Sequence, residues 1–312
     1  MISNILSMLA RHATLAFAIG MALALVAPPI CEAVGPTLPI WIFSMLTLSV
    51  VRTDTVALAG HIRRPARSVA VIFWMLVLSP LIVGSGLIAF IPLSESLMAP
   101  LLFYTAMPPL TAVSALALLF GIDAALAIVV LMAGSLITPL ILPPMALLVL
   151  GIQIDIGVGE LFVRLAALVF GSFLAGLVIR RLAGQVRINR HAGPIDGLMV
   201  IVMVLVVIAV FDGVHGPMHA NPDLALALVA MAFGAVILYQ IVGAVLFLPF
   251  GLRTALTAGM LSGNRNLAIL AAVLGASATT EIALFVALGQ LPVFLLPLIQ
   301  RPLARHFGFS SS

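Results

Sequence analysis

The sequence predicts an all-α membrane protein of ten transmembrane helices, arranged as a five-plus-five inverted repeat in which helices 4 and 9 are discontinuous. Composition is the first observation: of 312 residues, 63% are hydrophobic and 8% charged, and the mean hydropathy is +1.32. Soluble domains carry about 25% charged residues. The other two observations are the division of the chain into ten apolar runs and the interruption of two of those runs.

The apolar runs are separated by Pro, Gly or charged residues, and each is long enough for a helix that crosses the bilayer, which takes roughly 20 residues. Barrel strands are about half that length and alternate in polarity, so helices are expected. The predicted spans are 13–30, 37–58, 68–91, 97–119, 122–150, 160–182, 195–213, 222–248, 253–275 and 279–304.

The 14 basic residues are all arginine, and most lie in short loops, where they set topology. With Arg11 in the cytoplasm, ten spans place the other loop arginines on the same side, namely Arg63, Arg64, Arg67, Arg180, Arg181, Arg187, Arg190, Arg253, Arg301 and Arg305. Both termini are then cytoplasmic, and nucleic acid is not expected as a partner. Arginine without lysine, with abundant alanine, is typical of a GC-rich bacterial genome, so the expected location is the bacterial inner membrane.

The longest basic loop follows span 6 near the middle of the chain, and two sets of five spans would insert in opposite orientations. Many secondary transporters have this inverted-repeat plan. We expect residues 1–182 to hold the first repeat plus span 6, and 183–312 to hold the remaining spans 7–10. The boundary between the repeats should fall near 151–160, within one membrane domain.

Span 9 contains five consecutive small or polar residues, Ser262-Gly263-Asn264-Arg265-Asn266, between two apolar stretches. A guanidinium at bilayer depth costs several kcal/mol unless it faces protein or water. Irregular backbone at that depth is tolerated only where it lines a cavity or is buried in protein. Span 4 carries a matching interruption at Pro108-Pro109, because Pro109 has no N–H and forces Pro108 out of helical geometry.

Together these residues resemble the bile acid:sodium symporter family and its wider bile/arsenite/riboflavin transporter superfamily. The resemblance lies in the ten-span layout, the Pro108-Pro109 break followed by Gly121-Ile-Asp123, the Thr138-Pro139-Leu140 segment and the Gly263-x-x-Asn266 break. It implies that spans 4 and 9 cross near the membrane centre, that a core domain moves against a panel domain, and that the substrates are organic anions.

The chain departs from the family pattern at the sodium sites. The family commonly has Glu-x-Gly-x-Gln-Asn in span 9; here Leu261 replaces the Glu and Arg265 replaces the Gln. The family's Ser-Asn pair in span 4 falls on Val113 and Ser114. Sodium needs oxygen ligands, and a fixed cation would repel it. The usual two-sodium coupling is therefore not expected, and neither a metal site nor a cofactor is predicted.

These features predict a secondary transporter of a small organic anion, bile-acid-like or a carboxylate, that works by alternating access. In one hypothesis Arg265 and the exposed N–H groups of the breaks bind the anion. In the other, Arg265 takes the place of a bound sodium ion and transport is sodium-independent. A structural role, in which Arg265 caps carbonyls of the broken partner helix, is the alternative to both. The expected substrate-binding residues are Arg265, Asn264, Asn266, Ser262, Thr111, Ser114, Pro108 and Pro109.

Other functions remain open at this stage: a sodium-independent exporter of organic anions or a metalloid, or a membrane receptor that does not transport. An enzyme is not expected, because the sequence shows no paired carboxylates, Ser-His-Asp set, phosphate loop or zinc helix motif. Substrate identity, direction, coupling by sodium or protons, and oligomeric state are not fixed by the sequence.

Several polar residues have structural interpretations. Asp123 should cap the start of span 5, and Glu160 with Arg164 should form a surface i,i+4 pair. Arg52 and Asp54 should reach toward solvent at the end of span 2. His215 and His219 are spaced like metal ligands, but we expect Gly216 and Pro217 to break any helix between them and to leave both in a solvated external loop.

Overall fold

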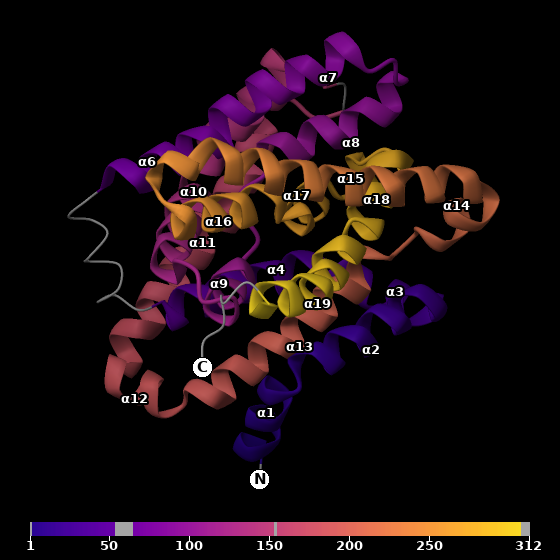
Figure 1. Ribbon diagram of the computed structural model, residues 1–312. Helices are drawn as coiled ribbons and strands as arrows, with labels where there is room; N and C mark the ends of the chain where they lie inside the picture. The colour runs from indigo at the N-terminus through magenta and orange to yellow at the C-terminus, as the bar shows by residue number, and fades with distance from the viewer. Residues whose placement is uncertain (1, 54–64, 153–154, 307–312) are drawn as a thin grey trace.

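The computed structural model describes residues 2–53, 65–152 and 155–306, and within these ranges the chain is helical with short connections and contains no β-strand (Figure 1). The α-helices are α1 (Ile2–Arg11), α2 (Ala13–Val26), α3 (Pro28–Val34), α4 (Leu38–Arg52), α6 (Pro65–Phe73), α7 (Ser85–Phe90), α8 (Glu95–Ala106), α9 (Val113–Leu119), α10 (Ala124–Pro144), α11 (Val158–Ala183), α12 (Gln185–Arg190), α13 (Ala192–Val210), α14 (His215–Ala220), α15 (Pro222–Phe247), α16 (Leu252–Gly263), α17 (Leu267–Leu274), α18 (Thr280–Leu288) and α19 (Gln290–His306). Two π-helical turns, Trp74–Leu78 and Pro80–Gly84, join α6 to α7, and a third, Met145–Val149, follows α10.

Within the described residues, seven helical stretches are long and apolar enough to cross a membrane, and the protein is an all-α membrane protein. These stretches are Pro28–Arg52, Ala66–Phe90, Ala124–Val149, Val158–Ala183, Ala192–Val210, Pro222–Phe250 and Thr280–Pro297. An eighth candidate is bent by 84° where α1 meets α2. Spans 4 and 9 of the sequence prediction are each divided into two shorter helices, so they do not qualify by length.

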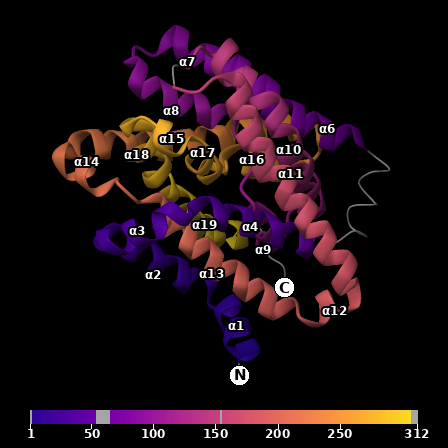
Figure 2. The same cartoon turned by 180° about the vertical axis from the view of Figure 1, so that it is seen from behind.

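The helices pack in two groups. In one, α13 packs against α1, α2 and α4, and α4 packs against α11. In the other, α15 packs against α16 and α18, and α10 packs against α9 and α6. Figures 1 and 2 show α1–α4 and α13 on one side of the molecule and α6–α8 on the opposite side, with α15–α18 between them. The half-helix α17 also contacts α4, α11 and α13, so it lies where the two groups meet.

Helices α15 and α16 pack closely along their length, and glycine makes that approach possible. A Cβ atom added to Gly259 would lie 2.4 Å from the carbonyl oxygen of Gln240, and one added to Gly263 would lie 2.5 Å from that of Val236. Glycines four residues apart let membrane helices bring their backbones into contact. The end of α16, where the chain breaks, is therefore held tightly against α15.

The end of α4 is fixed by two arginines. Arg52 forms a bidentate pair with Asp196 of α13, with Nε–Oδ1 and Nη2–Oδ2 distances of 2.6 and 3.2 Å. Arg180 of α11 donates to the carbonyls of Val50, at 3.1 Å, and Thr53. Arg52, which was expected to reach toward solvent, is 28% exposed at the end of α4, and its partner Asp196 was not predicted. Asp54, Arg63 and Arg64 lie outside the described residues.

Two of the predicted local features are confirmed. The Asp123 carboxylate accepts the N–H of Leu126 at 2.9 Å and caps α10, and Glu160 pairs with Arg164. The solvated loop expected at His215 is wrong, because α14 begins at this residue. Pro217 lies in the first turn of α14, where a missing N–H costs nothing. His215 is buried, with Nε2 2.8 Å from the carbonyl oxygen of Ala24.

Candidate functional site

The two predicted interruptions are present and lie against each other. Helix α8 ends at Ala106 and α9 begins at Val113, while α16 ends at Gly263 and α17 begins at Leu267. The extended segments between them form an isolated antiparallel bridge in which Pro109 and Arg265 are opposite each other. We call this the crossing and define it by residues 107–112 and 262–266.

Main-chain hydrogen bonds hold the crossing together. The N–H of Leu110 donates to the carbonyl of Asn264 at 2.8 Å, and the N–H of Asn266 donates to the carbonyl of Pro108 at 2.9 Å. Each break therefore supplies partners for polar backbone groups of the other. Without such partners, irregular backbone buried in a membrane protein would lose several kcal/mol per unsatisfied group.

The Arg265 side chain is buried beside this bridge, with an exposed fraction of 1%. Four of its five N–H groups donate to protein oxygens. Nε donates to the carbonyl of Ser262 at 2.6 Å. Nη1 donates to the carbonyls of Met107 at 2.7 Å and Met75 at 3.1 Å, and Nη2 to the Ser79 hydroxyl at 3.1 Å. We call these four acceptors the oxygen cage.

Two carbonyls of the cage, those of Met107 and Met75, are available because proline interrupts the helices that carry them. Met107 directly precedes Pro108 and Pro109, so α8 cannot continue past it. In the π-helical turn Trp74–Leu78, the N–H of Ser79 bonds to the carbonyl five residues earlier, that of Trp74. The corresponding partner of Met75 would be Pro80, which has no N–H. The guanidinium thus satisfies acceptors that the local sequence leaves open.

Aromatic residues complete the surroundings of Arg265. Its guanidinium carbon lies 5.5 Å from the ring centre of Tyr239, a cation–π contact. Tyr104 packs edge-on against Tyr239, with ring centres 5.4 Å apart, and its hydroxyl donates to the carbonyl of Gly263. Trp74 Nε1 donates to the Ser262 hydroxyl at 3.0 Å. These contacts fix the end of α16 and leave the charge of Arg265 inside protein.

Two asparagines at the crossing have polar atoms without a partner among the described residues. Asn264 Nδ2 donates to the carbonyl of Met260 at 2.8 Å, but its Oδ1 accepts nothing. Neither polar atom of the Asn266 side chain is hydrogen-bonded, although Asn266 is at the N-cap position of α17. Both residues are 1% exposed. Buried polar atoms without partners are rare in native proteins, and each calls for an explanation.

The other residues expected in the site are less closely engaged. Ser262 contributes its carbonyl to the cage. Thr111 Oγ1 lies 3.5 Å from the Met45 sulfur, and the Ser114 hydroxyl donates back to the carbonyl of Thr111 at 3.2 Å. Leu261 and Val113, where the resemblance places sodium ligands, are fully buried in one apolar cluster. The structure thus brings together Pro108, Pro109 and residues 262–266.

Sequence reasoning missed the partners of Arg265 on the third span. Ser79 supplies a hydroxyl and Met75 a carbonyl, and the only sequence signal for them is Pro80 inside an apolar run. No protein-family model and no curated protein matches the chain.

Proposed function

We propose that the protein is a secondary transporter of small organic anions that works by alternating access, with the crossing as its substrate site. The observation that carries the proposal is the pairing of two interrupted helices around a buried positive charge. In transporters, interrupted helices at matching positions of the two halves mark the substrate site. The ten-span inverted repeat, with both termini in the cytoplasm, belongs to the same proposal.

Asn266 and Asn264 are the proposed substrate contacts. The unpartnered Nδ2 of Asn266 lies at the N-cap position of α17, where the helix dipole favours negative charge, and it can donate to a carboxylate. The unpartnered Oδ1 of Asn264 can accept from a hydroxyl or N–H group of the substrate. Thr111 and Ser114 stand on the opposite break and supply hydroxyl groups. The Asn266 side chain makes no hydrogen bond in the described part of the chain, and the hydroxyls of Thr111 and Ser114 make only a sulfur contact and a local bond, whereas the cage already occupies most donors of Arg265.

Arg265 is therefore proposed to act as a tethered cation. Three carbonyls and one hydroxyl from three separate segments surround it, which is an arrangement of oxygen ligands suited to a hard cation. A guanidinium fixed there keeps the crossing assembled and adds positive potential for the substrate without a dissolved ion. Transport is accordingly proposed to be sodium-independent.

The decisive experiment compares two asparagines that occupy equivalent positions. Asn221 caps α15, and its side-chain oxygen accepts the N–H of Leu224 at 3.1 Å. Asn266 occupies the N-cap position of α17, but its side chain makes no hydrogen bond within the described residues. Asn266→Ala should abolish uptake of carboxylates and sulfonates into proteoliposomes while leaving the protein as stable as wild type or more so. Asn221→Ala should lower stability by about 1 kcal/mol and leave uptake intact. Undiminished uptake by Asn266→Ala would refute the proposed site.

Sodium independence is tested on the same proteoliposomes. Uptake should persist when sodium is exchanged for choline on both sides of the membrane, because the cage holds its own charge. If uptake of every substrate collapsed on that exchange, the tethered-cation role of Arg265 would be wrong.

A further inference from the structure

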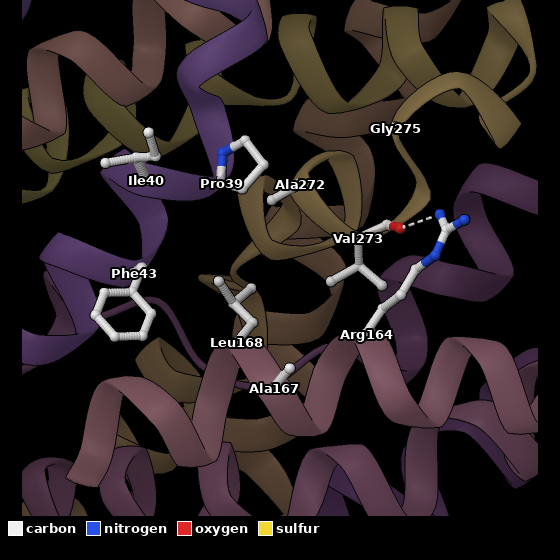
Figure 3. Close-up of a pocket in the computed structure, with 9 residues that line it drawn as sticks. All are labelled: Pro39, Ile40, Phe43, Arg164, Ala167, Leu168, Ala272, Val273 and Gly275. Carbon is white, nitrogen blue, oxygen red and sulfur yellow. Dashed lines mark hydrogen bonds between the residues drawn. The ribbon is translucent and has the colours of Figure 1, made fainter. Parts of the chain in front are cut away.

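An open cavity of about 550 Å³ lies between α4, α11 and α17 (Figure 3), and none of its lining residues belongs to the crossing. It meets α17 at Ala272 and Val273 and reaches Gly275 just after that half-helix, at the end opposite to its start beside Asn266. Ligand sites for small molecules typically enclose about 300–1,000 Å³. The cavity is therefore large enough for a small organic molecule.

The lining is apolar apart from one residue. Phe43 from α4, Leu168 from α11 and Val273 from α17 face the cavity, and among the described residues that line it Arg164 alone is charged (Figure 3). Ile40 on the rim is 59% exposed. The lining thus suits a ligand with an apolar body and a single polar head, entering from the side where Ile40 is exposed.

Arg164 is a guanidinium that an anion can reach. Its side chain is 39% exposed, in contrast to the 1% exposure of Arg265. Nη1 donates to the carbonyls of Val273 at 2.9 Å and Leu274 at 3.4 Å, which holds the group at the cavity wall. Nη2 pairs with Glu160. Nε and the second hydrogen of Nη2 have no partner within the described chain.

Glu160 is the group that a ligand would replace. It is 52% exposed, and ion pairs of this exposure and i,i+4 spacing contribute only tenths of a kcal/mol. Both residues belong to the first two turns of α11, which begins at Val158. Since α11 is long enough to cross the bilayer, Arg164 lies near one end of the span, and the apolar lining extends from it toward Phe43.

We propose that this cavity binds a single-chain amphipathic anion, with its alkyl body against Phe43, Leu168 and Val273 and its carboxylate or sulfonate on Arg164 in place of Glu160. This site is separate from the crossing and goes beyond the proposed transport function. Its test measures binding, so the outcome is independent of whether the protein transports anything.

The experiment uses the full chain in phosphatidylcholine nanodiscs and titrates decanoate by calorimetry, with decanol as the uncharged match. Decanoate should saturate one site and bind about tenfold or more tightly than decanol. Arg164→Gln should remove that preference, and Glu160→Gln should strengthen decanoate binding because the competing carboxylate is gone. Arg181→Gln, an exposed arginine at the other end of α11, is the matched control and should change nothing.

Filling the cavity gives a second readout that does not depend on Arg164. Ala167 lines the cavity from an exposed position, so Ala167→Trp should block both ligands without disturbing the core. Equal binding of decanoate by wild type, Arg164→Gln and Ala167→Trp would overturn the proposal.

Nanodiscs with phosphatidylglycerol distinguish the source of the anion. If that lipid abolished decanoate binding, the site would belong to a phospholipid headgroup and the single-chain ligand would be excluded.

Discussion

The carbonyl of Pro108 accepts the backbone N–H of Asn266 at 2.9 Å, which joins the two interrupted helices through their main chains. Together with the bond from Leu110 to Asn264, it makes the crossing a short two-stranded bridge inside a helical protein. Side chains add to this bridge, since Arg265 Nη1 donates to the carbonyl of Met107 at 2.7 Å and the Tyr104 hydroxyl donates to that of Gly263.

Arg265 should be essential for stability. Arg265→Ala leaves the cage carbonyls buried without a donor, at about 1–3 kcal/mol per group, so a total loss of at least ~3 kcal/mol is expected. Arg265→Lys keeps the charge but not the planar fork, and it should fall between alanine and wild type. Unfolding in detergent measures both losses.

Chemical rescue provides the control for this series. Methylguanidinium should raise the melting temperature of Arg265→Ala, because it can occupy the emptied cage, and should leave wild type unchanged. An alanine variant as stable as wild type would show that the cage contributes nothing.

The contact of α15 with α16 predicts opposite effects for two glycines. Gly259→Ala places a Cβ 2.4 Å from the Gln240 carbonyl and should destabilise the protein by about 2 kcal/mol. Gly234→Ala, also inside a helix, meets no atom within 4 Å and should stabilise by about 0.5–1 kcal/mol. Thermal unfolding of the two variants tests the contrast; equal melting temperatures would argue against close α15–α16 packing.

The pair of Arg52 and Asp196 should contribute modestly. The two side chains are 28% and 43% exposed, so solvent screens the attraction, and a coupling energy of about 0.5–1 kcal/mol is expected despite the bidentate geometry. A double-mutant cycle with Arg52→Gln and Asp196→Asn measures it. Arg52→Lys should lose most of the coupling, since lysine cannot donate in parallel. A coupling near zero in the cycle would mean that α4 and α13 are joined by apolar packing alone.

Asp212 should make stability depend on pH. Partial burial, and then the nearby Glu32, raise the pKa of this carboxyl above its ordinary value. The folded state therefore binds the proton more tightly than the unfolded state, and the free energy of unfolding falls as pH rises from the ordinary aspartate pKa through the raised one. Asp212→Asn should remove this slope and stabilise the protein at neutral pH. Unfolding measured across that range checks it, with the exposed Asp223→Asn as control; an unchanged slope would contradict the prediction.

The helix breaks were predictable because residues at the breaks themselves cause them. Pro108 and Pro109 remove N–H groups, and the polar run at Asn264 cannot continue an apolar helix in lipid. The capping of α10 by Asp123 was predictable for the same reason, because the carboxylate bonds to an N–H only three residues later. The hydrogen bonds from arginines to backbone carbonyls were not predictable. Every residue has a carbonyl, and only the fold determines which carbonyls lack a backbone N–H partner. Met75 is open because Pro80 follows a π-helical turn, and Val273 because α17 ends beside Arg164. The pairing of Asp196 with Arg52 was not predictable from the sequence, because the two residues are 144 positions apart.

The oxygen cage affects how the crossing depends on the ions in the surrounding solution. A positive group that is part of the polypeptide cannot be lost by dialysis or dilution, so the meeting point of the broken helices is assembled in any electrolyte. The positive charge at the crossing is encoded by one residue, Arg265, and needs no dissolved ion.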